Sequence, residues 1–287
     1  MSPRLDAHAH FFYPGFVGQL PESCRRLSPD EITLYQAYAQ QHEIAQVVAV
    51  GYEGDAWATG NNAYLATLTA QHKWVRPVAF VADPRLLTIT QLTEWQAQQF
   101  VGISLYLFTP EATAVLSQVA DEVWVWLSDH AWLISVNSTG ELWTSWQSIL
   151  ANYPELRLLI AHLGLPPTAE SAISLDEARA AMTPVLGLAQ FPHTYVKFSG
   201  FYALAVPGHA YPHNASWPYA QAIYNSYSPT RIIWASDFSP ALEFVSFPQT
   251  IDVLLAMTWL SLDDLAAIYH DNLARLLATV DERKPKP

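Results

Sequence analysis

Four side chains of this sequence could form one chemical site. His8 and His10 stand two residues apart, while His162 and Asp237 each end an apolar segment. Imidazole and carboxylate groups are common zinc ligands, and both also transfer protons near neutral pH. An isolated His-x-His pair also occurs in solvated loops, so the pair alone leaves both interpretations open. The four groups together predict metal-assisted or general acid–base chemistry.

Alternation along the first predicted strand positions the two histidines, because successive side chains of a strand point to opposite faces. One face, expected to pack on helices, carries apolar residues: Leu5, Ala7 and Ala9. The other face, expected to point inward, carries polar residues: Asp6, His8 and His10. The inward face therefore delivers two imidazoles to the carboxyl end of this strand.

His162 and Asp237 have simpler interpretations when each is taken alone. A single histidine at a strand end is usually structural, and Asp237 could cap a helix that opens near Pro240. However, all four groups fall at carboxyl ends of predicted strands. Barrel enzymes place their active sites at that edge, so the convergence favours one shared site.

Eight segments rich in β-branched and aromatic residues are expected to be the strands that hold these groups: Arg4–His10, Ile44–Val50, Val75–Val81, Phe100–Leu107, Trp132–Asn137, Leu156–His162, Thr194–Ser199 and Arg231–Asp237. Helix-compatible segments lie between them: Asp30–His42, Glu111–Asp129, Glu141–Asn152, Leu175–Gln190 and Trp217–Tyr227. This alternation predicts a single-domain (β/α)₈ TIM barrel over residues 1–280, followed by a disordered tail over residues 281–287. An open doubly wound sheet is the alternative, but no glycine-rich phosphate turn follows a predicted strand.

Composition narrows the classes of partner and compartment. The 287 residues have a formal net charge of −12 and no Lys/Arg cluster before the C-terminal tail, so neither nucleic acid nor a membrane is expected as a partner. Cys24 is the only cysteine, and neither a signal peptide nor a membrane-spanning run is evident. A cytoplasmic protein acting on a small molecule is expected, and the oligomeric state stays open.

Five motifs, in order along nearly the whole chain, resemble those of amidohydrolase-2 type metal-dependent hydrolases. They are LDAHAHFF, IAHLG, VKFSG, RIIWASDFSP and IYHDNLARLL. The seventh-strand motif and the stretch that leads into the eighth are most similar to the sugar-lactonase and dicarboxylate-lactonase branch. The resemblance implies a TIM-barrel hydrolase with His8, His10, His162 and Asp237 as its metal-site residues.

Two departures from the family pattern bear on the metal. Many relatives carry a metal-binding histidine at the end of the fifth strand, where this chain has Asn137 or Ser138. The fourth strand has no lysine that could be carbamylated to bridge two ions. The resemblance therefore implies at most one divalent ion, with zinc as the expected one. Members of the lactonase branch that lack the fifth-strand histidine include some that work without metal, so a metal-independent mechanism stays open.

Five polar residues near the predicted rim are candidates for contact with substrate: Lys197, Ser199, Tyr106, Asn137 and Tyr202. Lys197 and Ser199 share one face of the seventh strand. If that face points inward, Lys197 could hold a substrate carboxylate or hydroxyl. The alternative is a buried structural pair between Lys197 and a carboxylate such as Asp6.

The predicted reaction is hydrolysis of a small lactone or related cyclic ester. His8 and His10 are expected to hold one divalent ion, with Asp237 as a third ligand or close partner. The ion, or His162 if there is none, would polarise the carbonyl, and Asp237 would take a proton from water and pass it to the leaving oxygen. Two alternatives remain open: a metal-dependent, non-oxidative decarboxylase of an aromatic acid, and a barrel that binds without turnover.

Overall fold

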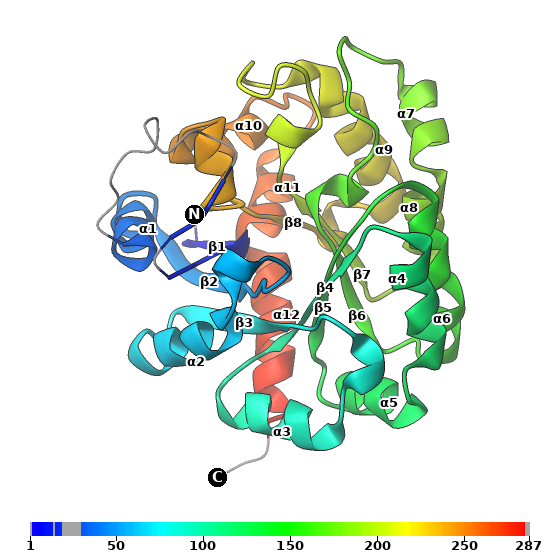
Figure 1. The fold of residues 1–287 in the computed structure, drawn as a ribbon. Coiled ribbons are helices and arrows are strands. Elements are labelled where there is room, and N and C mark those ends of the chain that lie inside the picture. Colours follow the sequence, from blue (N-terminus) through cyan, green and yellow to red (C-terminus); the bar gives the residue numbers. More distant parts are fainter. Residues whose placement is uncertain (1, 14, 19–29, 285–287) are drawn as a thin grey trace.

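The computed structural model describes residues 2–13, 15–18 and 30–284. Eight parallel strands follow one another around a single sheet: β1 (Arg4–Ala9), β2 (Ile44–Val50), β3 (Val75–Phe80), β4 (Gly102–Leu107), β5 (Leu133–Ser138), β6 (Arg157–Ile160), β7 (Thr194–Phe198) and β8 (Ile232–Trp234). The sheet curls into a nearly closed barrel with helices around it (Figure 1). The predicted (β/α)₈ TIM barrel is confirmed, and the open doubly wound sheet is excluded.

The first and last strands meet at a seam just beyond the end of β8. The backbone N–H of Asp237 donates to the carbonyl oxygen of His8 over 2.9 Å, and that of His10 donates to Phe238. Ala9 and Phe238 form a parallel bridge at the same place. The seam therefore brings residues from the two ends of the sequence next to each other.

Helices cover the outside of the barrel. They are α1 (Glu31–Gln41), α2 (Asn61–Gln71), α3 (Ile89–Ala97), α4 (Pro110–Ala114), α5 (Asp121–Asp129), α6 (Trp146–Asn152), α7 (Leu175–Ala181), α8 (Thr183–Gly187), α9 (Trp217–Tyr227), α10 (Phe247–Leu255), α11 (Leu262–Ala266) and α12 (Asn272–Glu282). Among the described residues, no helix is long and apolar enough to span a membrane.

Two of the predicted helices are divided in the structure. The predicted helix Glu111–Asp129 is two helices, α4 and α5, joined by a 3₁₀ turn. The predicted helix Leu175–Gln190 divides at Met182, because Pro184 cannot donate the hydrogen bond that would continue α7. The predicted helix Trp217–Tyr227 is α9 with the same bounds.

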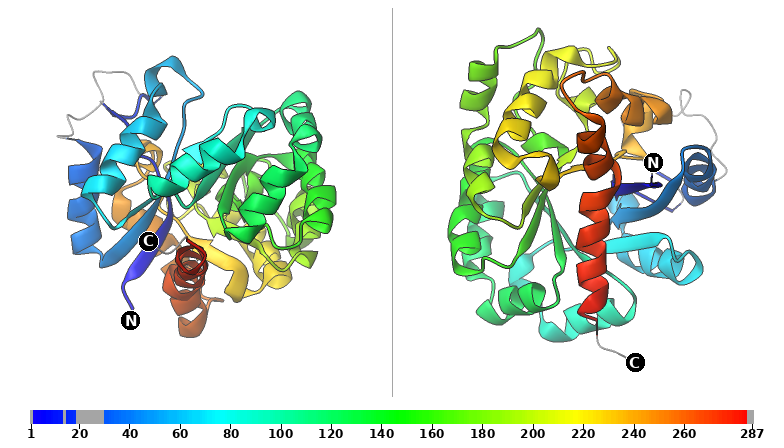
Figure 2. Two further views of the ribbon diagram at one scale, coloured as in Figure 1. Left: turned by 90° about the horizontal axis from the view of Figure 1, so that it is seen from below. Right: turned by 180° about the vertical axis from the view of Figure 1, so that it is seen from behind.

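The last helix, α12, lies beside β1 and β8, as the view from behind shows (Figure 2). The side-chain amide of Asn272 donates to the carbonyl oxygens of Pro229 and Ile232, each over 2.7 Å, and so anchors the start of α12 to the start of β8. Residues 281 and 282 belong to α12, and Asp281 pairs with Arg76. Residues 285–287 of the predicted tail lie outside the described residues, and the domain boundary stays a prediction.

Candidate metal and catalytic site

Three imidazoles converge on one carboxylate oxygen at the carboxyl end of the barrel. The Nε2 atoms of His8 and His162 each lie 3.8 Å from Oδ1 of Asp237, and the Nε2 atom of His10 lies 3.9 Å from it. All four residues are buried. The structure thus brings together the four residues that the sequence singled out.

A β-bulge in β1 sets the direction of its side chains. Asp6 is opposite Val47 and Ala9 is opposite Ala49, so three residues of β1 advance against two of β2. The Nε2 atoms of His8 and His10 lie 2.9 Å apart. The two side chains meet in the site.

Asp6 does not join the histidines as strict alternation had suggested. Its carboxylate accepts from the hydroxyl of Tyr35 on α1 over 2.8 Å and from the hydroxyl and backbone N–H of Ser236 after β8. Burial raises its pKa to about 6 despite these hydrogen bonds. Asp6 therefore ties α1 to the seam and supports the site from outside it.

Hydrogen-bond direction can be followed through His10 and His8. Nδ1 of His10 lies 2.8 Å from the carbonyl oxygen of Val50, which can only accept, so Nδ1 carries the proton and Nε2 presents its lone pair. In the neutral pair, Nε2 of His8 then donates to His10. That leaves Nδ1 of His8 as an acceptor for Lys197, whose Nζ lies 3.1 Å away.

Lys197 of β7 is fully buried inside the barrel. Its Nζ contacts His8 and donates to the hydroxyl of Ser135 on β5 over 2.7 Å. Burial lowers the pKa of Lys197 to about 7, although the carboxylates of Asp6 and Asp237 oppose this shift. The hydrogen-bond partners of Lys197 are thus His8 and Ser135, and Asp6 is not among them.

His162 follows β6 in a tight turn. Its φ is 51°, and Leu163 and Leu165 also have left-handed backbones, which turns the ring toward the seam. Nδ1 of His162 lies 2.9 Å from the hydroxyl of Ser199. A Cβ atom on Gly200 would lie 2.8 Å from this Nδ1, so only glycine permits the approach of β7 to the ring.

Asp237 also has a left-handed backbone, with φ of 57°, where the chain leaves β8. Its Oδ2 accepts from the hydroxyl of Tyr202 over 2.6 Å, which leaves Oδ1 directed to the three histidines. Burial raises the pKa of Asp237 to about 6, partly offset by His10, Tyr202 and Lys197. The carboxylate can therefore exchange a proton near neutral pH.

The histidines are held in their neutral forms. Burial lowers the pKa of His10 to about 4 and that of His162 to about 3, and it moves the pKa of His8 in the same direction. Lys197 adds to the shift of His8 and His162. Neutral imidazoles are the form that binds metal.

The donor atoms suit one divalent ion. Ligand atoms of His8, His162 and Asp237 all lie within 4.8 Å of one another. At zinc–ligand distances of about 2.0–2.2 Å, tetrahedral ligand atoms stand about 3.4 Å apart, close to the spacing between the imidazoles and Oδ1. Those imidazole–Oδ1 distances are also too long for hydrogen bonds. The group could therefore hold a metal.

The five predicted substrate residues occupy different places. Ser199 is hydrogen-bonded to His162, Tyr202 donates to Asp237, and Lys197 contacts His8. Tyr106 of β4 is half-buried, and burial and the charge of Asp237 raise its pKa. Asn137 of β5 is buried, and its Nδ2 atom has no hydrogen-bond partner in the described part of the chain.

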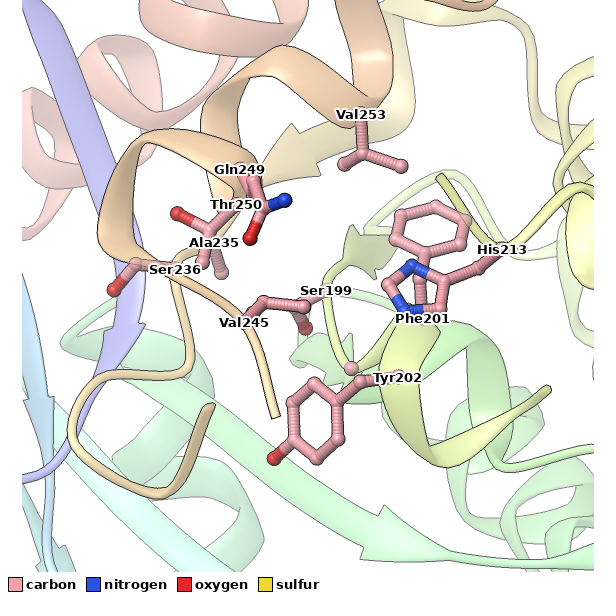
Figure 3. Close-up of a pocket in the computed structure, with 11 residues that line it drawn as sticks. Ser199, Phe201, Tyr202, His213, Ala235, Ser236, Val245, Gln249, Thr250 and Val253 are labelled. Atoms are coloured by element: carbon pink, nitrogen blue, oxygen red, sulfur yellow. The ribbon is translucent and has the colours of Figure 1, made fainter. Parts of the chain in front are cut away.

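Sequence reasoning missed two residues near the site: Ser135, which contacts Lys197, and His213, which borders a neighbouring cavity. Ser135 and Asn137 lie two residues apart on β5, a spacing that could have drawn attention to Ser135. His213 lies in the long segment after β7 and is 4% exposed. It borders a cavity beside the site, with Ser199, Tyr202 and Ser236 among the other lining residues (Figure 3). No spacing rule points to His213.

Comparison with known proteins identifies the family. The family model described as Amidohydrolase matches residues 5–279, so the chain belongs to this family. The protein is accordingly a hydrolase-like enzyme of the amidohydrolase superfamily. No curated protein matches the sequence.

Several solved structures share the fold. A zinc-bound amidohydrolase from Burkholderia multivorans is 19% identical, with 96% of this chain and 99% of that chain covered and a TM-score of 0.76. A probable 2-pyrone-4,6-dicarboxylic acid hydrolase from Acinetobacter baumannii, with citric acid bound, is 18% identical, with coverages of 97% and 100% and a TM-score of 0.69. At these identities the likeness establishes the barrel fold.

Proposed function

We propose that this protein hydrolyses a small lactone or related cyclic ester in the cytoplasm, with Asp237 as the proton-transferring group. The observation that carries the proposal is the convergence of three neutral imidazoles on Oδ1 of Asp237. A similar fold in a protein described as a probable 2-pyrone-4,6-dicarboxylic acid hydrolase adds support, because a 2-pyrone is a cyclic ester.

His8, His10, His162 and Asp237 would hold one divalent ion, with zinc favoured by the imidazole and carboxylate donors. Such an ion supplies Lewis-acid polarisation of a carbonyl oxygen and favours hydroxide at neutral pH. The hydrogen bond from Nδ1 of His10 to Val50 supports this role, since it leaves the Nε2 lone pair facing the site.

Asp237 would move the proton. Its carboxylate accepts a proton from the attacking water while the water oxygen bonds to the carbonyl carbon. The bond from that carbon to the ring oxygen then breaks, and the ring oxygen receives the proton from Asp237, giving a hydroxy acid. Tyr202 fixes the carboxylate through Oδ2 during both transfers.

Asn137 would bind the substrate carbonyl. Asn137 lies two residues after Ser135 on β5, so both side chains point to the same side of the strand. The hydroxyl of Ser135 accepts from Lys197 inside the barrel, and Asn137 is nearer to the carboxyl end of the strand. Its Nδ2 donor is buried, and no described residue accepts a hydrogen bond from it to replace those lost with water. A carbonyl oxygen that becomes negatively charged would satisfy it.

The test begins with metal content by mass spectrometry, on untagged protein purified without chelators. We expect close to one zinc per chain, lost in His8→Ala and kept in His209→Ala, which changes an exposed histidine. Zinc-loaded protein is expected to hydrolyse members of a lactone panel, and Asp237→Asn to lower kcat by about 10²–10⁴. Wild-type lactone hydrolysis by Asp237→Asn, or none by the zinc-loaded wild type, would overturn the proposal.

A further inference from the structure

A buried histidine outside the metal group has an unused acceptor. Nε2 of His213 lies 2.8 Å from the carbonyl oxygen of Gly208, so this nitrogen carries the ring proton. Nδ1 is therefore a lone-pair acceptor. It is buried, and none of the described residues is its hydrogen-bond partner. An acceptor left in this way costs free energy unless a donor reaches it.

The cavity that His213 borders has room for such a donor. Its volume is about 20 Å³, which suffices for one water molecule, and it lies between Ser199 and Ser236 at the strand ends and Gln249 and Thr250 of α10. Figure 3 shows the His213 ring reaching from its loop toward Ser199. A buried water needs two or more polar partners, and this lining offers them.

The hydroxyl of Ser199 connects this cavity to the metal group. Among the described residues its one hydrogen-bond partner is Nδ1 of His162, at 2.9 Å. With no acceptor in the cavity, Ser199 would donate to Nδ1 and the proton of His162 would sit on Nε2. With an acceptor there, Ser199 can donate into the cavity and receive the Nδ1 proton of His162.

We propose that one buried water joins Ser199 to His213, and that this relay fixes the tautomer of His162. The order of donation is Nδ1–H of His162 to Ser199, Ser199 to the water, the water to Nδ1 of His213, and Nε2–H of His213 to Gly208. The backbone carbonyl at the end sets the direction. Ser199 and His213 are thus positioning residues.

The relay determines what His162 can do. Its Nε2 is left with a lone pair that faces Asp237, which suits a metal ligand. The same nitrogen cannot then donate a hydrogen bond to a substrate carbonyl, as a metal-independent role for His162 would require. The relay extends the proposed function, because it prepares His162 as a metal ligand. The hydrogen bonds of the relay belong to the metal-free protein, so they can be tested even if the proposed function is wrong.

The test is the tautomer of His162, measured by long-range ¹H–¹⁵N correlation on metal-free protein. Wild type is expected to show Nδ1–H. Ser199→Ala and His213→Ala are expected to gain Nε2–H, whereas Ser199→Thr keeps the hydroxyl and His213→Asn keeps an acceptor. Asparagine also tolerates the left-handed backbone of residue 213. His209→Ala is the control in the same loop.

Zinc affinity gives a second measurement, by competition with a chelator. Ser199→Ala and His213→Ala are expected to bind zinc about 10- to 100-fold more weakly, and the conservative variants close to wild type. An Nε2–H tautomer in wild type, or no tautomer change in both alanine variants, would overturn the relay. If wild-type His162 carries its proton on Nδ1 but the protein does not bind zinc, the relay is supported. The metal ion of the proposed function is then contradicted.

Discussion

Nζ of Lys197 lies 3.1 Å from Nδ1 of His8, and both side chains are fully buried. Because Nε2 of His8 donates to His10 in the neutral pair, His8 must give up that proton before this nitrogen can bind an ion. The proton then belongs on Nδ1, where Lys197 can receive it only in the uncharged form. Charged Lys197 and a metal ion therefore require opposite tautomers of His8.

Zinc binding is accordingly expected to release a proton from Lys197. The pKa of Lys197 is lowered to about 7, so the release should fall as pH rises from about 7 to about 9, where Lys197 is already uncharged. Calorimetry in buffers of different ionisation enthalpy measures it. Lys197→Met should remove this pH dependence, and an unchanged release in that variant would contradict the explanation.

Asp237 is expected to titrate near pH 6 in the metal-free protein, since burial raises its pKa to about 6. The ionised carboxylate is the form that accepts a proton, so this form is lost as the pH falls through about 6. Carboxyl ¹³C NMR measures the midpoint. Asp83 serves as the internal control, because Arg85 holds its pKa below the usual range. A midpoint for Asp237 close to that of Asp83 would be incompatible with its burial.

Tyr202→Phe is expected to raise the pKa of Asp237 further, because the lost hydrogen bond stabilises the carboxylate. We expect kcat/KM near pH 7 to fall about 10-fold, with partial recovery at higher pH. Tyr224→Phe removes a similar bond, to Asp264, away from the site. Equal losses in the two variants would point to a general effect on folding.

Asn137→Leu is expected to lower kcat by about 10²–10³ without loss of stability. The variant removes an unpartnered buried donor and keeps a similar shape, so the free energy of unfolding should stay the same or rise. Asn272→Leu is the matched control, because its amide donates two hydrogen bonds and should cost about 2 kcal/mol or more. Wild-type kcat in Asn137→Leu would remove this residue from the mechanism.

Gly102→Ala is expected to destabilise the barrel by about 3 kcal/mol or more. A Cβ atom at this position would lie 2.0 Å from the carbonyl oxygen of Leu133, which is backbone of the neighbouring strand. Gly187→Ala in α8 meets nothing closer than 3.4 Å and should stabilise by about 0.5–1 kcal/mol. Thermal unfolding compares the two, and similar melting temperatures would contradict the steric argument.

The sequence predicted the barrel and the four central residues because both depend on local patterns. Apolar runs mark strands that are buried on both faces, and His162 and Asp237 stand where two such runs stop. Local alternation misplaced Asp6, since the bulge in β1 is a property of the pairing with β2. His213 could not be found at all. Its proposed role depends on a cavity that is lined jointly by residues of α10 and of the segment after β7.

The barrel closes through the same residues that form the site. The backbone N–H of Asp237 donates to the carbonyl oxygen of His8, although the two residues are 229 positions apart in the sequence. Both residues are therefore present only when nearly the whole barrel has been synthesised. A nascent chain therefore lacks Asp237, one of the four site residues, until its last strand has been synthesised and docked. Affinity for an ion would then report whether an individual molecule has finished folding, and a bound ion would hold the two ends of the sheet together at the seam.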